Sequence, residues 1–234
     1  MKIHRFFIAD DIVGATYVIQ DEDLVHQITR VLRIGTGERI ALVVGGGKQF
    51  LAEVVETEKR FVTVQVLEEQ QVWVPKQRII VCLSAIRKER FEWALEKCTE
   101  VGVSAVVPLI AARSERGIVP HERGMRIMQE AAEQCGRGDV PELGMSVTLT
   151  DMLAEVGDAC VIACDMGGGP LSDVPHLDSS DAIYLCIGPE GGWSDDERAL
   201  LQSHNAAFVS LGPTVLRAET AAVAACVLTM SAVQ

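Results

Sequence analysis

The sequence predicts an α/β chain with a small β-rich unit at the N-terminal side and a larger parallel-sheet domain after it. The early part contains short runs rich in β-branched and aromatic residues, such as HRFFIA and RFVTVQVLE, separated by glycine-containing turns. From Arg78 onward, apolar strand-like runs alternate with helical patterns, which is typical of a parallel sheet covered by helices. The WVPKQ segment, with Pro75, interrupts both patterns. We therefore expect two domains, residues 1–74 and residues 75–234.

One helix is expected within the β-rich unit. The stretch DEDLVHQITRVLRI has Leu24, Ile28, Val31 and Leu32 at helical spacing, with acids at its start and arginines near its end. The whole unit has the pattern of a compact barrel with one helix. As a set, its histidines and arginines are equally consistent with an RNA-facing patch and with a solvated surface, whereas a single one of them would be read as a surface charge. These candidate RNA-binding residues are His4, Arg5, His26, Arg30 and Arg33.

The second domain begins with the buried-type strand RIIVCLSAI, which is followed by the helical stretch RKERFEWALEKCTEVGV. In that stretch Phe91, Ala94, Leu95, Cys98 and Val101 fall on one face, and Gly102 is expected to end the helix. A strand (SAVVPLIA) and a helix (GMRIMQEAAEQCGR) come next, followed by the short helix TDMLAEV.

The remaining elements are the strands ACVIACD, AIYLCIG and AFVSLG, and two helices. The first helix, SDDERALLQSHN, opens with Ser194 and Glu197 at capping-box spacing. The last helix, from about Arg217, is apolar on nearly every face, so it is either fully internal or buried against a second copy of the chain. We interpret it as part of a homodimer interface.

Composition limits the location of the protein and its possible metal sites. The N-terminal residues lack the apolar region of a signal peptide, and no apolar run reaches the roughly 18 residues that cross a bilayer, so we expect a cytoplasmic protein without a membrane partner. The seven cysteines contain no CxxC pair and mostly lie in apolar runs, which predicts reduced, buried thiols. Cys160 and Cys164 form a CxxxC spacing without a nearby histidine, so zinc is a minor alternative and we expect no metal.

The charge is unevenly distributed along the chain. The net charge is −12, yet residues 1–137 hold 19 basic and 19 acidic residues, whereas residues 138–234 hold 2 basic and 14 acidic residues. A polyanion is therefore expected to bind the first part of the chain or the junction between the two parts, and not the acidic C-terminal surface.

Two loops carry the strongest functional signal, IGPEGGWSDDE and LGPTVLRAETAA. Their glycines, Gly188, Gly191, Gly192 and Gly212, allow a backbone to approach a ligand closely. The sequence lacks the motifs of two other kinds of site. It has no GxxxxGK[ST] phosphate-binding loop and no GxSxG nucleophile elbow. The Gly45–Gly47 run follows a strand but leads into another strand-like run, so it does not form a phosphate-binding turn.

This pair of loops resembles the hallmark of the SPOUT, or trefoil-knot, RNA methyltransferases, and more narrowly the RsmE family, which methylates N3 of a uridine in 16S ribosomal RNA of the small subunit. HRFF and HQITRVLR resemble the PUA-like RNA-binding β-barrel of that family, and RKERFEWALEKCTEVGVSAVVPL and EAAEQCGRGDVPEL resemble its other catalytic-domain motifs. The resemblance implies an α/β-knot domain over residues 75–234, a homodimer, and small-subunit rRNA or the assembled subunit as partner.

The resemblance also implies the cofactor S-adenosylmethionine, held by backbone groups of two loops at 185–192 and 211–216. Leu83 and Leu109 are expected to wall the adenine, Glu190 to satisfy loop amides, and Thr220 to donate a hydrogen bond or to begin the last helix. The implied cofactor-binding residues are Leu83, Leu109, Leu185, Ile187, Gly188, Pro189, Glu190, Gly191, Gly192, Leu211, Gly212, Val215, Leu216 and Thr220.

Methylation at N3 of uridine requires loss of a proton and stabilisation of charge on the flanking carbonyl oxygens. Arg217 is the candidate for that stabilisation, because a guanidinium suits planar oxygens. Glu219 either orients Arg217 or accepts the proton, and the alternative is an acid that only favours the helix N-terminus. Candidate contacts to RNA phosphates are Arg87, Lys88, Arg90, Arg113, Arg116 and Arg137.

Two other functions stay open at this point. A SPOUT enzyme that methylates a ribose 2′-OH of rRNA or tRNA would share both loops. A non-catalytic RNA-binding assembly factor that has kept the fold is the alternative outside enzymology.

Overall fold

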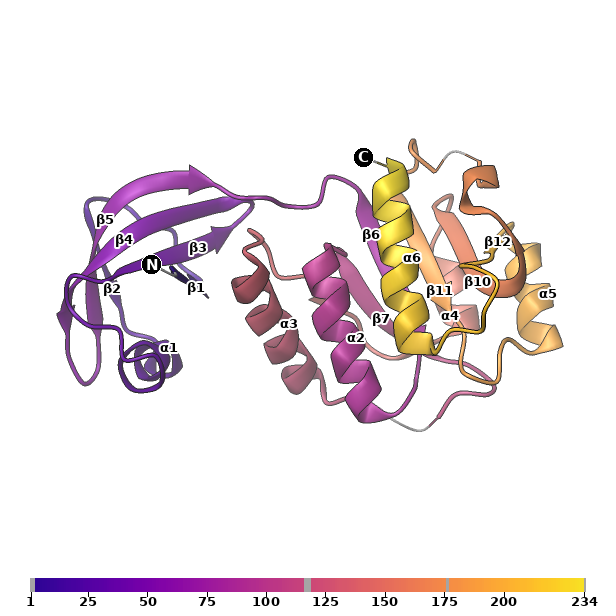
Figure 1. The fold of residues 1–234 in the computed structure, drawn as a ribbon, viewed down its shortest axis with the longest axis horizontal. Coiled ribbons are helices and arrows are strands. Elements are labelled where there is room, and N and C mark those ends of the chain that lie inside the picture. The colour runs from indigo at the N-terminus through magenta and orange to yellow at the C-terminus, as the bar shows by residue number, and fades with distance from the viewer. Residues whose placement is uncertain (1–2, 116–118, 176, 234) are drawn as a thin grey trace. The chain divides into compact units, whose positions relative to one another are not determined.

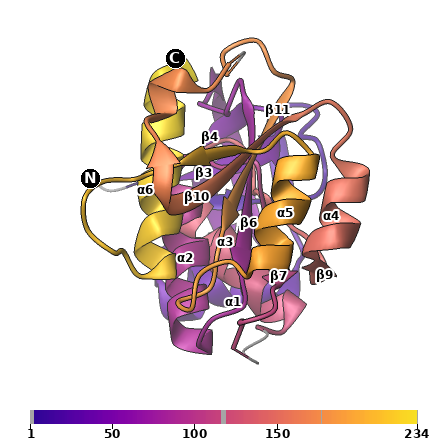
Figure 2. The same cartoon turned by 90° about the vertical axis from the view of Figure 1, so that its right-hand side faces the viewer.

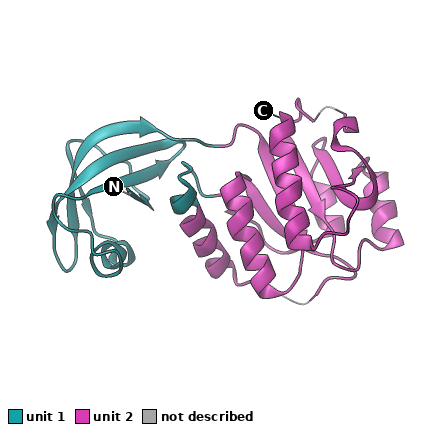
Figure 3. Cartoon of the chain, in the orientation of Figure 1, with its two compact units in different colours: residues 1–74, 132–140 teal, residues 75–131, 141–234 magenta. Residues whose placement is uncertain are grey.

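The computed structural model describes residues 3–115, 119–175 and 177–233. The chain divides into two compact units (Figure 3), one made of residues 1–74 and 132–140 and the other of residues 75–131 and 141–234. A short segment from the later part of the chain thus belongs to the first unit.

The first unit is a mixed five-stranded sheet in the order β1-β3-β4-β5-β2, strongly curved in Figure 1. β1 is parallel to β3, and the other neighbours are antiparallel. Its core contains buried aliphatic and aromatic side chains such as Phe6, Ile40 and Val64. The predicted small β-rich unit is therefore confirmed. Its strands are β1 (His4–Phe7), β2 (Thr16–Ile19), β3 (Arg39–Gly45), β4 (Lys48–Thr57) and β5 (Val62–Gln71).

The helix expected in this unit is interrupted. α1 (Glu22–His26) starts at the N-cap Asp21, whose carboxylate accepts a hydrogen bond from the Leu24 amide at 2.8 Å, and it runs into a π-helical turn at Gln27–Val31. A π turn is wider than an α turn, so the residues after it are rotated away from the α-helical face. The predicted apolar face is consequently wrong at Val31, which is 62% exposed.

The second unit contains a seven-stranded sheet in the order β12-β10-β11-β6-β7-β8, with β9 also paired to β7. The strand pairs are parallel, which confirms the predicted α/β domain. The strands are β6 (Arg78–Ser84), β7 (Ala105–Ile110), β8 (Glu142–Leu143), β9 (Val147–Thr148), β10 (Cys160–Gly169), β11 (Ala182–Ile187) and β12 (Ala207–Val209).

Helices cover both faces of this sheet (Figure 2), with α2 and α6 on one side and α4 and α5 on the other. Gly102 ends α2 in the left-handed conformation at φ 113°, and Ser194 and Glu197 form the capping box of α5, both as predicted. The helices are α2 (Lys88–Val101), α3 (His121–Cys135), α4 (Leu149–Glu155), α5 (Asp195–Ser203) and α6 (Ala218–Val233), with a 3-10 turn at Leu171–Asp173.

The last helix, α6, is buried on one side only. Ala222, Ala225 and Cys226 are buried between the helix and its neighbours α2, β6 and β11, whereas Val227 and Leu228 are 49% and 44% exposed. The alternative of a fully internal helix is therefore wrong, and α6 presents apolar side chains on its outer face. Within the described residues, no helix is both long enough and apolar enough to cross a membrane.

Candidate functional site

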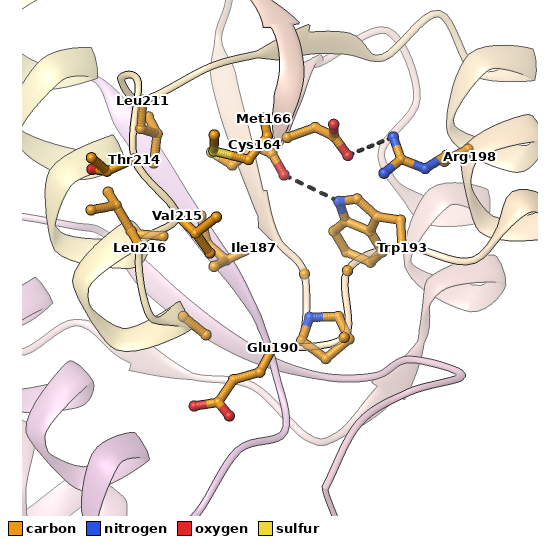
Figure 4. Close-up of a pocket in the computed structure, with 17 residues that line it drawn as sticks. Cys164, Met166, Ile187, Glu190, Trp193, Arg198, Leu211, Thr214, Val215 and Leu216 are labelled. Atoms are coloured by element: carbon orange, nitrogen blue, oxygen red, sulfur yellow. Dashed lines mark hydrogen bonds and ion pairs between the residues drawn. The ribbon is translucent and has the colours of Figure 1, made fainter.

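A cavity of about 280 Å³ lies where three neighbouring strands, β12, β10 and β11, reach their carboxyl ends (Figure 4). Ligands of open parallel sheets bind at this edge, because the loops that follow adjacent strands converge there. One wall is the end of β10, the second is the loop after β11, and the third is the loop between β12 and α6. The lining residues are Cys164, Asp165, Met166, the stretch 187–193, Arg198, Leu211, Thr214, Val215, Leu216, Ala218 and Ala221.

The structure brings nine of the predicted cofactor residues together in this lining. They are Ile187, Gly188, Pro189, Glu190, Gly191, Gly192, Leu211, Val215 and Leu216. The five others do not line the cavity. Leu83, Leu109 and Leu185 are core residues with at most 1% exposure, so their side chains form no wall for a ligand here. Gly212 lies in the loop between lining residues, and Thr220 is exposed on α6.

The loop after β11 is held in a compact turn. The Gly192 amide donates to the Pro189 carbonyl at 2.8 Å, and Gly192 has a left-handed φ of 68° that favours glycine. A Cβ atom at Gly188 would lie 3.0 Å from Cε2 of the Trp193 indole, which is tighter than ordinary van der Waals contact. The Trp193 indole N–H donates to the Cys164 carbonyl at 3.3 Å, which joins this loop to the end of β10.

Charged groups in the lining are already paired. The Asp165 carboxylate pairs with the Arg198 guanidinium at 2.5 Å (Figure 4). It also accepts a hydrogen bond from the Gly167 amide at 2.9 Å. Arg198 is the basic residue of the described lining, and this pairing leaves it poorly suited to bind a phosphate. The remaining surface is mostly glycine backbone and apolar side chain, which suits a neutral adenosine group.

Cys164 lines the cavity without offering a nucleophile. Burial, aided by the neighbouring Cys186 and Asp165, raises the pKa of the Cys164 thiol to about 12. The thiol is therefore protonated at neutral pH, and a protonated thiol is a weak nucleophile and a poor metal ligand. All seven cysteines are free, and the described residues hold no cluster of three or more histidine, cysteine or acidic side chains placed to bind a metal ion.

Arg217 and Glu219 flank the cavity at the start of α6. Arg217 is exposed and lies between the lining residues Leu216 and Ala218, although its own side chain does not line the cavity. Glu219 is 8% exposed, and its Oε1 atom lies 3.6 Å from Nε of Arg90. Its Oε2 atom is buried without a hydrogen-bond partner in the described residues. The ion pair of Glu219 is thus with Arg90, a partner that sequence reasoning did not identify.

Two of the arginines predicted to contact RNA instead hold the loop after β11. Arg90 pairs with the Glu190 carboxylate, and Nη1 of Arg113 donates to the Gly191 carbonyl at 2.8 Å. Glu190 therefore meets a guanidinium, where loop amides were expected. Arg87 and Lys88 remain exposed, with ion pairs to Glu115 at 3.6 Å and Glu92 at 3.8 Å, respectively. Arg116 lies outside the described residues.

Arg137 is placed where it cannot reach an RNA phosphate in this structure. Its side chain is 1% exposed, donates to both oxygens of Asp139 at 3.0 and 2.8 Å, and lies 5.8 Å from the centroid of the Trp73 ring. A buried, paired guanidinium would have to lose these contacts to bind elsewhere. The other candidates of the first unit are more accessible: His4 and Arg5 are half-buried on β1, and His26, Arg30 and Arg33 are exposed.

Comparison with known families gives two matches along the chain. The family described as "RNA methyltransferase domain" matches residues 74–230, and the family described as "RNA methyltransferase PUA domain" matches residues 19–67. The first match alone covers more than half of the chain.

Individual relatives align over nearly the whole chain. The ribosomal RNA small subunit methyltransferase E of Rickettsia conorii is 28% identical over 230 residues, covering 96% of this chain and 94% of the relative. The protein of the same name from Bacillus subtilis is 29% identical and covers 88% of this chain and 86% of the relative.

Solved structures agree with the sequence matches. The small subunit methyltransferase E of Neisseria gonorrhoeae, bound to S-adenosyl methionine, superposes with a TM-score of 0.88 at 29% identity over 99% of this chain and 98% of that chain. A Legionella pneumophila methyltransferase in complex with the same cofactor gives a TM-score of 0.91 at 28% identity, with the same coverage. The chain therefore belongs to the RsmE family of small-subunit ribosomal RNA methyltransferases, with an RNA methyltransferase domain and a PUA-like domain.

Proposed function

We propose that this protein transfers a methyl group from S-adenosylmethionine to N3 of a uridine in 16S rRNA of the small ribosomal subunit. The observation that carries the proposal is the cavity at the ends of β10, β11 and β12, in a chain that aligns over most of its length with RsmE relatives. Its glycine-rich, mostly apolar walls and its paired arginine fit an adenosine-containing ligand better than a phosphate.

The residues that would hold the cofactor are those of the two loops, 187–192 and 211–216, with Trp193 and the end of β10 as further walls. When bound, S-adenosylmethionine supplies an electrophilic methyl group on its sulfonium. At Gly192 a Cβ atom would have nothing within 4 Å, so its backbone is open to a ligand, whereas Gly188 and Gly191 leave room for Trp193 and Arg113 against the loop. Cys164, as a neutral thiol, contributes surface only.

Two groups at the start of α6 supply the chemistry on the base. The N3 proton must leave before N3 can accept the methyl group, and the resulting negative charge spreads over N3, O2 and O4. That charge would be consumed as N3 bonds to the methyl carbon and the bond between the methyl group and the sulfonium breaks, which would leave a neutral thioether. The exposed Arg217 guanidinium is the candidate to stabilise that charge, since planar donors match carbonyl oxygens. The unpartnered Oε2 atom of Glu219 is the candidate acceptor for the proton.

Transfer of labelled methyl groups tests the function directly. We expect the protein, given radiolabelled cofactor and small ribosomal subunits from a strain that lacks this modification, to label one uridine in the 16S rRNA. Chromatography with mass spectrometry of the digested RNA should identify 3-methyluridine. A 2′-O-methylated nucleoside would support the ribose-modifying alternative, and no transfer to free rRNA or to subunits would support a non-catalytic assembly factor.

The protein is also proposed to act in the cytoplasm as a homodimer, with the outer face of α6 in the interface. Exposed Val227 and Leu228 give that face an apolar character that a second copy would cover. We expect Leu228→Glu to convert a dimer to a monomer in analytical ultracentrifugation, because each copy would bury an unpaired carboxylate in the apolar interface. Met145→Glu, at an apolar side chain that is 73% exposed outside α6, is the matched control and should remain dimeric. A dimeric Leu228→Glu variant would place the interface elsewhere.

A further inference from the structure

Arg90 joins two segments that are far apart in the sequence. It lies in the first turn of α2, and its side chain pairs with Glu190 in the loop after β11 and with Glu219 in the first turn of α6. The Arg90 and Glu219 side chains are 27% and 10% exposed, so this ion pair is largely shielded from water, whereas the Glu190 side chain is 49% exposed. Shielding makes an ion pair stronger than the same pair on an open surface.

Both carboxylates belong to segments that form walls of the proposed cofactor site, although only Glu190 lines the cavity itself. Glu190 lines the cavity, and Glu219 follows the lining residue Ala218. Arg90 itself does not line the cavity. One cation outside the cavity thus holds two of its walls, while Arg113 holds the same loop through the Gly191 carbonyl.

We propose that Arg90 is a positioning residue of the methyltransferase site, which fixes the loop after β11 against the start of α6 by sharing one guanidinium between Glu190 and Glu219. This inference rests on the proposed cofactor site. It adds that the Arg90 side chain sets the separation between two walls of that site. The reason that the role needs an arginine is geometric, because Nη1 serves Glu190 while Nε faces Glu219.

The shared cation has a distinctive consequence when it is removed. Without Arg90, Glu190 and Glu219 would be two carboxylates near each other with no cation between them, and like charges at short range repel. The loop would then move away from α6 and widen the cavity. In the native protein Glu190 anchors the loop, whereas in a protein without Arg90 the same Glu190 would push the loop away.

The test is a double-mutant cycle on cofactor affinity, measured by isothermal titration calorimetry with S-adenosylmethionine. We expect Arg90→Gln to weaken binding about tenfold and Glu190→Gln to weaken it about threefold. In the Arg90→Gln background, however, Glu190→Gln should strengthen binding by about threefold, because it removes the repulsion. A residue that matters only for packing would give losses that add, without this reversal of sign.

Lys97→Gln is the matched control. Lys97 is also on α2 and also lies between two carboxylates, Glu96 at 2.7 Å and Glu100 at 2.8 Å, but these belong to its own helix. Its loss should leave cofactor affinity within about twofold of the native value. If Arg90→Gln does not fold, Arg90→Met replaces it in the cycle, since it also removes the cation and keeps an apolar stem to pack against the helix.

The outcomes separate this inference from the proposed function. A native protein that does not bind S-adenosylmethionine would overturn the proposed function and the role of Arg90 together. Two outcomes would overturn the role of Arg90 alone, given that the native protein binds the cofactor. One is a cycle in which the losses of affinity add, and the other is an Arg90→Gln variant with native affinity. Reversal of sign in the Arg90→Gln or Arg90→Met background would support it.

Discussion

Replacing Arg217 with alanine is expected to lower the rate of methyl transfer by about 100-fold or more, the effect of removing a group that stabilises charge in a transition state. The affinity for S-adenosylmethionine should change less than about threefold, because the Arg217 side chain does not line the cavity. Single-turnover transfer from labelled cofactor to unmodified small subunits measures the rate, and calorimetry measures the affinity. Loss of rate without loss of affinity is the signature of a residue that acts on the base.

Two further variants make this expectation specific. Arg217→Lys keeps the charge but loses the planar fork, so its rate should fall between those of the native protein and the alanine variant. Arg78→Ala removes another exposed arginine, one that begins β6 at the amino end of the parallel strands and pairs with Glu142 at 3.4 Å, and it should transfer methyl groups at the native rate. A native rate for Arg217→Ala, or equal losses in Arg217→Ala and Arg78→Ala, would remove Arg217 from the mechanism.

Local sequence signals predicted most of the regular structure. The apolar spacing of α2, its terminal glycine and the capping box of α5 depend on residues within one or two turns of each other, so they are visible in a single sequence. The π turn after α1 was not visible, because it changes the hydrogen-bonding period without a change in composition. The segment 132–140 joins the first unit through contacts with residues distant in sequence, which no local pattern records.

In the candidate site, too, the features set by local sequence were predictable and those set by distant contacts were not. The two glycine-bearing loops were found because each is a local run, and nine of the predicted residues line one cavity. The end of β10, with Asp165, was missed, although the rule that ligands bind at the carboxyl ends of parallel strands could have indicated it. Its position beside β11 depends on strand order, which requires the fold.

Charged residues were the least predictable part. Arg90, Arg113 and Arg137 look alike in the sequence, as basic residues available for RNA. In the structure Arg90 bridges two carboxylates, Arg113 holds a loop carbonyl, and Arg137 is buried against Asp139 and Trp73. The partner of a long side chain is set by tertiary contacts, so a count of charges predicts the net field but not the function of any one group.

Gly191→Val is expected to abolish measurable binding of S-adenosylmethionine, with a loss of about 100-fold or more in affinity. A Cβ atom at Gly191 would lie 3.2 Å from Cδ and 3.3 Å from Cβ of Arg113, so the loop and Arg113 cannot both keep their positions. The two further methyl carbons of valine add to this crowding. A shift of either partner weakens the hydrogen bond from Arg113 to the Gly191 carbonyl, which holds the loop beside the cavity.

The control is Gly169→Val, in the same sheet but outside the lining, where a Cβ atom would have nothing within 4 Å. That variant should bind the cofactor with native affinity, since a branched residue suits a strand. Thermal unfolding by circular dichroism should show both variants folded, because Gly191 lies in an exposed loop and its replacement leaves the core unchanged. Native affinity in a folded Gly191→Val protein would mean that the cofactor does not approach this loop, and the proposed site would have to be moved away from the end of β11.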